Sequence, residues 1–317
     1  MPAETFESIF SAFPAATAQQ WKDKILSDLK GESFEKLIAS NADGIEILPF
    51  YTAADNQKFR LDIPPKKNKS WMVAERISIN DMAESNQRAL EALQNGAMCI
   101  VFNAQDKILE ETDIRTLLKS IQLDIAPVYF ENYASEDREP LEAAAPGSCT
   151  ERISVPQLES KTDELVYALF KSMAEPSNKI IVHFSIGPNY FLEIVKLRAF
   201  RWLWKQLNDI HQTDKEAVVF CESGFQKRSD EDENNNILRN TTEAMSAVIG
   251  GCDALLINPH NHDESSAFGK RIARNVQNIL LYESGFGSLD DAGKGTYFIE
   301  YLTYSLSQKT WEKLKAL

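Results

Sequence analysis

The residues of this sequence that could carry chemistry are first of all its histidines. The four are His183, His211, His260 and His262. His260 and His262 stand one residue apart in NPHNHDES, and Asp263 follows directly. At the mouth of an α/β barrel this group, with His183, could bind a divalent metal ion, as in a metal-dependent hydrolase. A solvated polar loop is the simpler interpretation of the same pattern.

The sequence shows no further motif for nucleophilic or nucleotide chemistry. It contains no GxSxG, Walker A or GxGxxG pattern. Its cysteines are widely spaced and form no CxxC pair, which is typical of buried thiols in a reducing compartment, so we expect a cytoplasmic protein. Lys294, in AGKGTY, could hold a phosphate on a glycine-rich turn, but an ordinary loop is the simpler interpretation.

Charge and length exclude several classes of partner. The net charge is −13 and the basic residues are scattered, so we exclude nucleic acid and anionic membranes as main partners. No apolar run has the length needed to span a bilayer. The 317 residues, 43% of them hydrophobic, provide a substantial core for one large domain or two ordinary ones.

Strand and helix patterns alternate from Trp71 onward. Short apolar runs predict strands at 71–78, 97–103, 122–130, 151–155, 180–186, 217–222 and 254–259. Helical periodicity predicts helices at 80–94, 111–119, 159–174, 188–208, 232–249, 265–285 and 297–315. Such alternation over about 250 residues predicts a TIM (β/α)8 barrel, and an open doubly wound sheet fits the same rhythm. Residues 131–150 lack a clear unit, so one repeat should be shortened or missing.

The first 70 residues do not follow this alternation. We expect two helices within 5–40, a short extended piece at 44–52, and a polar linker or strap at 52–70 that contains Pro64 and Pro65. We therefore divide the chain into an N-terminal arm and linker (1–70) that makes subunit contacts, and a barrel (71–317).

The predicted helix 188–208 is apolar almost all round, so it should be buried on two sides. The second side could be covered by this chain or by another subunit, because tryptophan and arginine are enriched at interfaces. Our interface candidates are Trp202, Trp204 and Phe200, together with Trp21 of the arm.

Five parts of the sequence form a characteristic series, namely GIEILPFYT, IGPNYFLEIVKLRAFRWLW, NNNILRNTTEAMSAVIGG, FGKRIARNVQNIL with YESG, and AGKGTYFIEYLT. Together and in this order they closely resemble the methylmalonyl-CoA mutase family. The resemblance implies a TIM barrel behind an N-terminal arm that wraps the partner subunit in heterodimeric members. In the catalytic members, a C-terminal domain holds adenosylcobalamin against the barrel mouth and acyl-CoA threads along the barrel axis. Those members interconvert (R)-methylmalonyl-CoA and succinyl-CoA by a radical rearrangement.

Three motifs of the catalytic members are altered here. WMVAERIS stands where they carry an RQYAGF-like run, whose tyrosine packs on the acyl group. ISVPQLES replaces a strand ending in SGYH, whose histidine hydrogen-bonds the thioester carbonyl. FCESGFQKRS replaces HCQTSGWS, so that Glu222 and Gln226 take the places of a glutamine and a tryptophan near the corrin. Because the loss of one positioned donor alone costs about 10²–10³ in rate, we expect a catalytically silent chain.

The resemblance thus implies the small (beta) subunit of a heterodimeric methylmalonyl-CoA mutase of propionate metabolism, which stabilises a large subunit that binds adenosylcobalamin. We expect no catalytic residue, metal or cofactor in this chain, no cobalamin-binding domain, and possible homodimers of the isolated chain. Glu283, in YESG, matches a family glutamate beside the corrin and would be a vestigial cofactor contact. The alternatives are a barrel that still binds CoA esters and the metal-dependent hydrolase that uses His260, His262 and Asp263.

Overall fold

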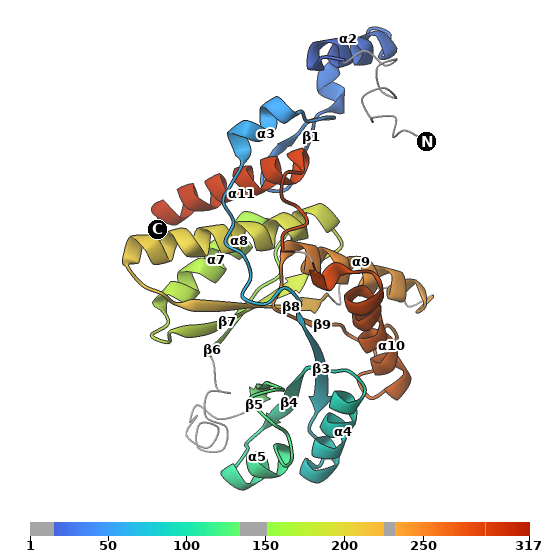
Figure 1. The fold of residues 1–317 in the computed structure, drawn as a ribbon, viewed down its shortest axis with the longest axis vertical. Coiled ribbons are helices and arrows are strands. Elements are labelled where there is room, and N and C mark those ends of the chain that lie inside the picture. Colours follow the sequence, from blue (N-terminus) through green and yellow to red (C-terminus); the bar gives the residue numbers. More distant parts are fainter. Residues whose placement is uncertain (1–15, 134–150, 225–231, 289) are drawn as a thin grey trace, which may run out of the picture.

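A computed structural model describes residues 16–133, 151–224, 232–288 and 290–317 of the chain. Its centre is a parallel seven-stranded sheet with the order β5-β4-β3-β9-β8-β7-β6 (Figure 1). The strands are β3 (Met72–Ser78), β4 (Cys99–Lys107), β5 (Val128–Tyr133), β6 (Glu151–Val155), β7 (Lys179–Ile186), β8 (Glu216–Ser223) and β9 (Ala254–Leu256). The sheet has the strand order of a barrel, because its first and last strands in the sequence, β3 and β9, pair with each other as they do in a closed barrel. It is a half-barrel because β5 and β6 do not pair with each other in the described residues.

The predicted α/β class and barrel order are confirmed, in a form that is open on one side. Within the described residues, β5 and β6 each pair with one strand only, and they are the two edges of the sheet. Of the irregular unit expected at 131–150, only the start is described, where residues 131–133 form the end of β5; residues 134–150 lie outside the described ranges.

Helices follow the strands and cover the outer face of the half-barrel (Figure 1). They are α4 (Met82–Gln94), α5 (Glu111–Leu117), α7 (Lys161–Ala174), α8 (Tyr190–His211), α9 (Asn235–Gly250), α10 (Ala267–Asn278) and α11 (Tyr297–Lys315). A π-helical turn, η2 (Ile279–Glu283), and a 3₁₀ turn, η3 (Phe286–Ser288), follow α10. In the part of the chain that is described, no helix is both long and apolar enough to cross a membrane.

Two predicted boundaries were wrong. The strand expected at 122–130 begins only at Val128, because residues 122–126 form a turn closed by hydrogen bonds to the Gln122 carbonyl. The linker expected at 52–70 contains a helix, α3 (Ala53–Phe59), which begins with a capping box between Thr52 and Asp55. An edge-to-face contact between Phe59 and Tyr301, with ring centroids 5.1 Å apart, holds α3 against α11.

The N-terminal segment consists of short elements on one side of the half-barrel. They are α2 (Ala18–Asp28), a 3₁₀ turn η1 (Phe34–Leu37), and a two-stranded antiparallel sheet of β1 (Ala39–Ser40) and β2 (Glu46–Ile47). One of the two helices expected within 5–40 is therefore present, and residues 5–15 lie outside the described ranges. Asp43 connects this segment to the barrel, because its carboxylate accepts hydrogen bonds from Ser160 and from the first backbone N–H groups of α7.

Side chains of successive strand residues alternate between the two faces of the sheet. The outward residues pack under the helices, as Val182, Phe184 and Val219 do in the largest core cluster. The inward residues form a smaller apolar layer, made of Ala74, Cys99, Val101, Ile181, Val218, Phe220, Ala254 and Leu256. At the carboxyl ends of the strands this inner face changes from apolar to charged.

Candidate functional site

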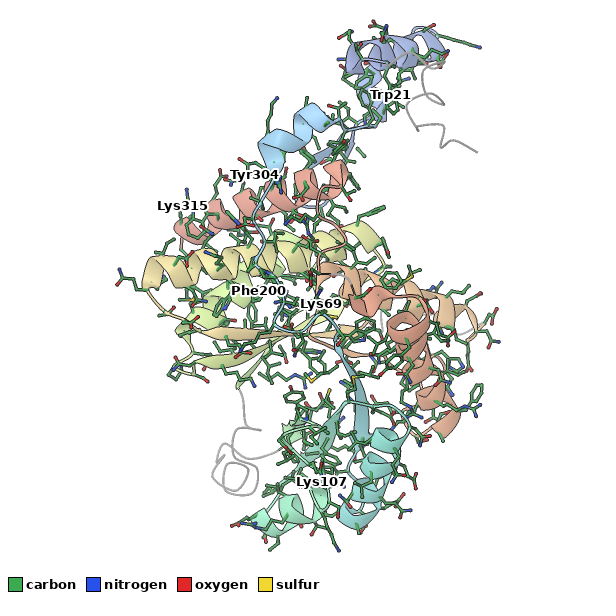
Figure 2. The ribbon with its side chains drawn as sticks, viewed as in Figure 1. Trp21, Lys69, Lys107, Phe200, Tyr304 and Lys315 are labelled. Atoms are coloured by element: carbon green, nitrogen blue, oxygen red, sulfur yellow. The ribbon has the colours of Figure 1, made fainter. Side chains whose placement is uncertain are left out.

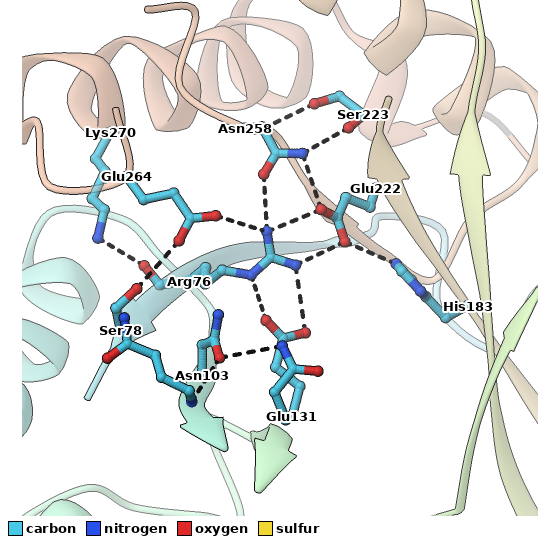
Figure 3. Close-up of polar contacts among 12 residues, drawn as sticks. Arg76, Ser78, Asn103, Glu131, His183, Glu222, Ser223, Asn258, Glu264 and Lys270 are labelled. Atoms are coloured by element: carbon cyan, nitrogen blue, oxygen red, sulfur yellow. Dashed lines mark hydrogen bonds and ion pairs between the residues drawn. The ribbon is translucent and has the colours of Figure 1, made fainter. Parts of the chain in front are cut away.

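Arg76 is the centre of a charged cluster on the inner face, at the carboxyl ends of the strands (Figure 3). It comes from β3 and is 12% exposed as a side chain. Its Nη1 and Nη2 donate to the two carboxylate oxygens of Glu222 on β8, each at 2.9 Å. Its Nε donates to Glu131 on β5 at 2.5 Å, and Nη1 also reaches Asn258 at 3.0 Å. One guanidinium thus connects three strands and the residue that follows β9.

Further polar contacts surround this centre. Arg152 on β6 donates to the second Glu131 oxygen at 2.6 Å. Asn258 donates to Glu222 at 3.0 Å and to the Ser223 carbonyl at 2.7 Å, which fixes its amide in place. Side chains from β3, β5, β6 and β8, with Asn258 after β9, therefore form one network of salt bridges and hydrogen bonds, in which positive and negative groups alternate.

His183 on β7 completes the cluster. Its Nε2 lies 3.0 Å from a Glu222 oxygen. Burial lowers the pKa of His183, and this effect exceeds the opposite influence of the Glu222 hydrogen bond. Burial alone would raise the pKa of Glu222, but the hydrogen bonds and charge supplied by His183 and Arg76 outweigh it and hold that pKa well below its usual value.

These ionisation states decide what the cluster can do. Glu222 remains a carboxylate and Arg76 a cation, since the pKa of Arg76 is raised by Glu222 and Glu131 in spite of burial. A carboxylate held so far below neutral pH is a poor proton acceptor, because a general base works best with a pKa near the working pH. The geometry is that of a structural salt-bridge cluster.

Aromatic side chains fill the inner face beneath the cluster. Phe220 is 2% exposed and meets Tyr129 edge to face at 5.9 Å between ring centroids. It also contacts the His183 ring at 5.5 Å, and the Arg152 guanidinium lies 5.5 Å from its centroid. Bulky groups thus occupy the space inside the half-barrel between the charged cluster and the lower strand residues.

The amino-terminal end of the sheet, by contrast, is hollowed. A cleft of about 910 Å³ lies there, between the chain at 64–70 and the end of α8. Met72 and Tyr129 line it on the strand side, and Arg201 and Trp204 line it on the helix side. The Phe220 layer and the charged cluster lie beyond this cleft, toward the carboxyl ends of the strands.

The histidines predicted from the sequence do not come together in a metal site. His260 is 5% exposed and packs edge to face on Phe268, whereas His262 is exposed, at a φ of 57°. Asp263 accepts hydrogen bonds from Ser265 in a local turn. Among the residues that the structure describes, no three His, Cys, Asp or Glu side chains are grouped so that they could hold a metal ion.

The other candidates lie in varied surroundings. Phe200 is fully buried against Phe184, Trp204 is 7% exposed, and Trp202 is half-buried, so most of this set packs inside the chain's own core. Trp21 is 54% exposed at the far end of the N-terminal segment, where it stacks on Phe50 (Figure 2). Glu283 is exposed at the end of the π-helical turn, and Lys294 lies in an exposed turn before α11.

Sequence reasoning missed Arg76, Glu131, Arg152 and Asn258 as members of one site. The sequence contains one indication of this site, because Arg76 and Arg152 are charged residues within predicted strands. A charged side chain that faces the inside of a sheet needs a partner of opposite charge. The partners come from distant strands, however, and only the folded sheet shows which residues they are.

Comparison with known proteins finds similarity to methylmalonyl-CoA mutases. A family model described as methylmalonyl-CoA mutase matches residues 172–317. The methylmalonyl-CoA mutase small subunit of Porphyromonas gingivalis is 27% identical over 98% of this chain, and that of Streptomyces virginiae is 25% identical over 98%. The chain spans 64% and 65% of the lengths of these two relatives. The methylmalonyl-CoA mutase of Rhizobium meliloti is 37% identical over 44% of this chain and 21% of its own length.

Solved structures show a more distant likeness. A dihydropteroate synthetase crystallised with a product aligns with 70% of this chain and 99% of its own, at 11% identity and a TM-score of 0.37. The Yersinia pestis dihydropteroate synthase aligns with 68% of this chain and 94% of its own, at 10% identity and a TM-score of 0.34.

Proposed function

We propose that this chain is the small subunit of an adenosylcobalamin-dependent methylmalonyl-CoA mutase, and its similarity to methylmalonyl-CoA mutases and their small subunits supports the proposal. In this proposal it pairs with a large subunit that binds both adenosylcobalamin and the acyl-CoA, and it acts in the cytoplasm in propionate metabolism. The chain itself is catalytically silent. Its contribution is to cover and stabilise the catalytic subunit.

The observation that carries the silent role is the salt bridge between Arg76 and Glu222. These residues belong to two of the three runs in which this chain departs from catalytic members, and Arg152 directly precedes the third. Arg76 and Glu222 bond to each other on the inner face near the carboxyl ends of their strands, and Arg152 reaches the same cluster through Glu131. Enzymes with this architecture place their reacting groups at that end of the barrel, so the salt-bridge cluster occupies the space that a substrate would need.

The proposed partner contact is supported by the N-terminal segment. None of the eleven residues of α2 is buried. Isolated helices of this length are marginal in water, and most helical stability in proteins comes from packing of an apolar face. A second chain that covers Trp21 would supply this packing, so we assign residues 1–70 to the subunit interface and 71–317 to the barrel that carries it.

The stabilising role is tested by producing the large subunit with and without this chain. We expect the two chains to co-purify as a heterodimer, and the large subunit to unfold at a higher temperature in the complex, because binding to the folded state stabilises it. An unrelated acidic protein at the same concentration is the control for non-specific effects. If the large subunit is equally stable in both preparations, the proposed role is wrong.

A second candidate function is supported by the cleft at the amino-terminal end of the sheet. Its volume of about 910 Å³ lies within the range of small-molecule sites. A residual site for CoA esters there would leave the chain a binding module without catalysis. Isothermal titration of the isolated chain with succinyl-CoA tests this candidate, which predicts saturable heat that Arg201→Ala weakens. The absence of measurable heat contradicts it.

A further inference from the structure

A second cleft lies outside the barrel, between α4 and α10. Its volume is about 480 Å³, and its floor is formed by the outward side chains of β3, Glu75 and Ile77. The inner-face cluster projects from the other side of the same strand, so the two sites are separate. Lys270 and Arg274 belong to FGKRIARNVQNIL, one of the runs that carry the family resemblance, but the proposed function makes no use of this cleft.

Two cations in this cleft lack a carboxylate partner. Lys270 on α10 donates a hydrogen bond to the Arg76 carbonyl at 2.9 Å, and Arg88 on α4 lines the facing wall. Glu75 is paired with Arg274, which is the third cation of the cleft. Within the described ranges, neither Lys270 nor Arg88 forms an ion pair with an acidic side chain.

The positions of these groups follow from helical geometry. On α10, Ala267, Lys270 and Arg274 are spaced by three and four residues, so they lie on one face of the helix. On α4, Glu84, Arg88 and Glu91 share a face in the same way. The two faces meet over β3, and this brings the positive groups of two helices together.

The surroundings of Lys270 destabilise its positive charge. Burial and then the positive charge of Arg88 lower its pKa to about 8, although Glu75 and Glu264 act in the opposite direction. A cation that is partly removed from water beside a second cation gains most from a bound anion, because each charge is then compensated at short range. Glu84 and Glu91 also line the cleft, but they are exposed, so water screens their charges.

We propose that the cleft between α4 and α10 binds the carboxylate or phosphate group of a small molecule, held between Arg88 and Lys270. Arg88 supplies a planar fork of N–H donors, which matches either anion, and Lys270 supplies a compact charge from the other wall. Ser265 and the start of α10 border the same space and add polar contacts. The volume leaves room for a polar body of the ligand beyond its anionic group.

The proposal is tested by isothermal titration of the full chain with sodium succinate and sodium phosphate as separate probes, at constant ionic strength. Binding of either probe supports the proposal, and the tighter one identifies the anionic group. Arg88→Met and Lys270→Met should each weaken binding about tenfold or more. Lys24→Met is the control and should not change it, since Lys24 is exposed on α2 and paired with Asp28. Thermal melts confirm that each variant is folded.

A pH series with succinate separates this site from general attraction to a charged surface. The affinity should fall as the pH rises from about 7 to about 9.5, because Lys270 loses its proton in that interval. In Lys270→Met, the affinity for succinate should no longer decrease with rising pH. Lys270→Arg should keep the binding but should also lack this pH dependence. The proposal is overturned if neither probe binds, or if Arg88→Met and Lys270→Met both bind as the unchanged chain does.

Discussion

Arg76 and Glu222 form a bidentate salt bridge between two strands that are not neighbours. The two N–H···O distances are both 2.9 Å, and β9 lies between β3 and β8 in the sheet. The salt bridge therefore spans the concave face of the half-barrel. Both side chains are about nine-tenths buried, so the attraction acts in a medium less polar than water.

Breaking this salt bridge from one side should be costly. In Arg76→Met, the carboxylates of Glu131 and Glu222 lose a buried partner, and we expect a loss of about 3–5 kcal/mol in the free energy of unfolding. Urea denaturation measures it. Lys24→Met, which breaks an exposed pair on α2, should cost no more than about 0.5 kcal/mol. Equal effects of the two substitutions would show that the buried cluster is not a structural element.

The double variant Arg76→Met/Glu222→Met should lose less stability than the two single variants together. In the double variant, neither Arg76 nor Glu222 remains as a buried charge without its partner. Coupling energies between contacting residues are about 0.5–3 kcal/mol. A double-mutant cycle from urea denaturation gives this number. Strict additivity would mean that the two groups do not interact, whatever their distance.

Stability should fall on mild acidification because of His183. Burial lowers the pKa of His183 in the folded chain below its ordinary value of 6.5, so the unfolded chain takes up the proton first. The stability that neutral His183 allows is therefore complete above about pH 6.5 and is lost as the pH falls below that value. The Glu222 contribution has the same sign, but its loss begins only as the pH falls below about 4.5.

Denaturation of the unchanged chain and of His183→Phe at several pH values isolates the histidine. The unchanged chain should lose stability between about pH 6.5 and 5 more steeply than the variant. Parallel curves for the two proteins over this interval would contradict the assignment of a buried, neutral His183.

Asp43 should hold the N-terminal segment against the barrel. Its carboxylate accepts hydrogen bonds from the Ser160 hydroxyl at 2.8 Å and from the Thr162 N–H at 2.9 Å, at the positive end of α7. Asp43→Ala should cost about 1 kcal/mol and increase hydrogen exchange in residues 39–47. Asp28→Ala, on exposed α2, is the matched control. Unchanged exchange in Asp43→Ala would show that other contacts hold the segment.

Trp21 and Trp204 should behave in opposite ways. Trp204 is buried and donates from Nε1 to the Lys215 carbonyl at 2.9 Å, so Trp204→Ala should destabilise the isolated chain by about 3–5 kcal/mol. Trp21 is 54% exposed, so Trp21→Ala should leave the isolated chain nearly unchanged and weaken heterodimer formation about tenfold or more. Analytical ultracentrifugation of the complex measures the second effect. Full affinity of the Trp21 variant would place the interface elsewhere.

Much of the fold could be predicted from local patterns. Apolar runs such as 180–186 and 217–222 correspond closely to β7 and β8, because a strand buried on both faces is apolar along its whole length. The helix predicted at 232–249 corresponds to α9, which ends where Gly251 adopts a positive φ of 95°. The strand predicted at 122–130 was too long because Ile125 and Ala126 are apolar residues of a turn. A short apolar run does not distinguish a strand from such a turn.

The site was less predictable, for a physical reason. His260 and His262 are close in sequence, but a turn at positive φ separates their surroundings, one buried and one in water. Arg76 and Glu222 are 146 residues apart and are brought together by the cyclic order of the sheet. The sequence shows that each is a charged residue within a predicted strand. Which residues pair depends on strand order and register, and the hydrophobic periodicity of the sequence does not determine these.

The central claim is that this chain contributes shape and stability to a mutase without performing its chemistry. The most direct measurement is the turnover of (R)-methylmalonyl-CoA to succinyl-CoA by this chain alone, supplied with adenosylcobalamin, beside the same assay with the large subunit added. We predict no conversion above the protein-free background for the chain alone, and conversion once the large subunit is present. Conversion by the isolated chain would contradict the account.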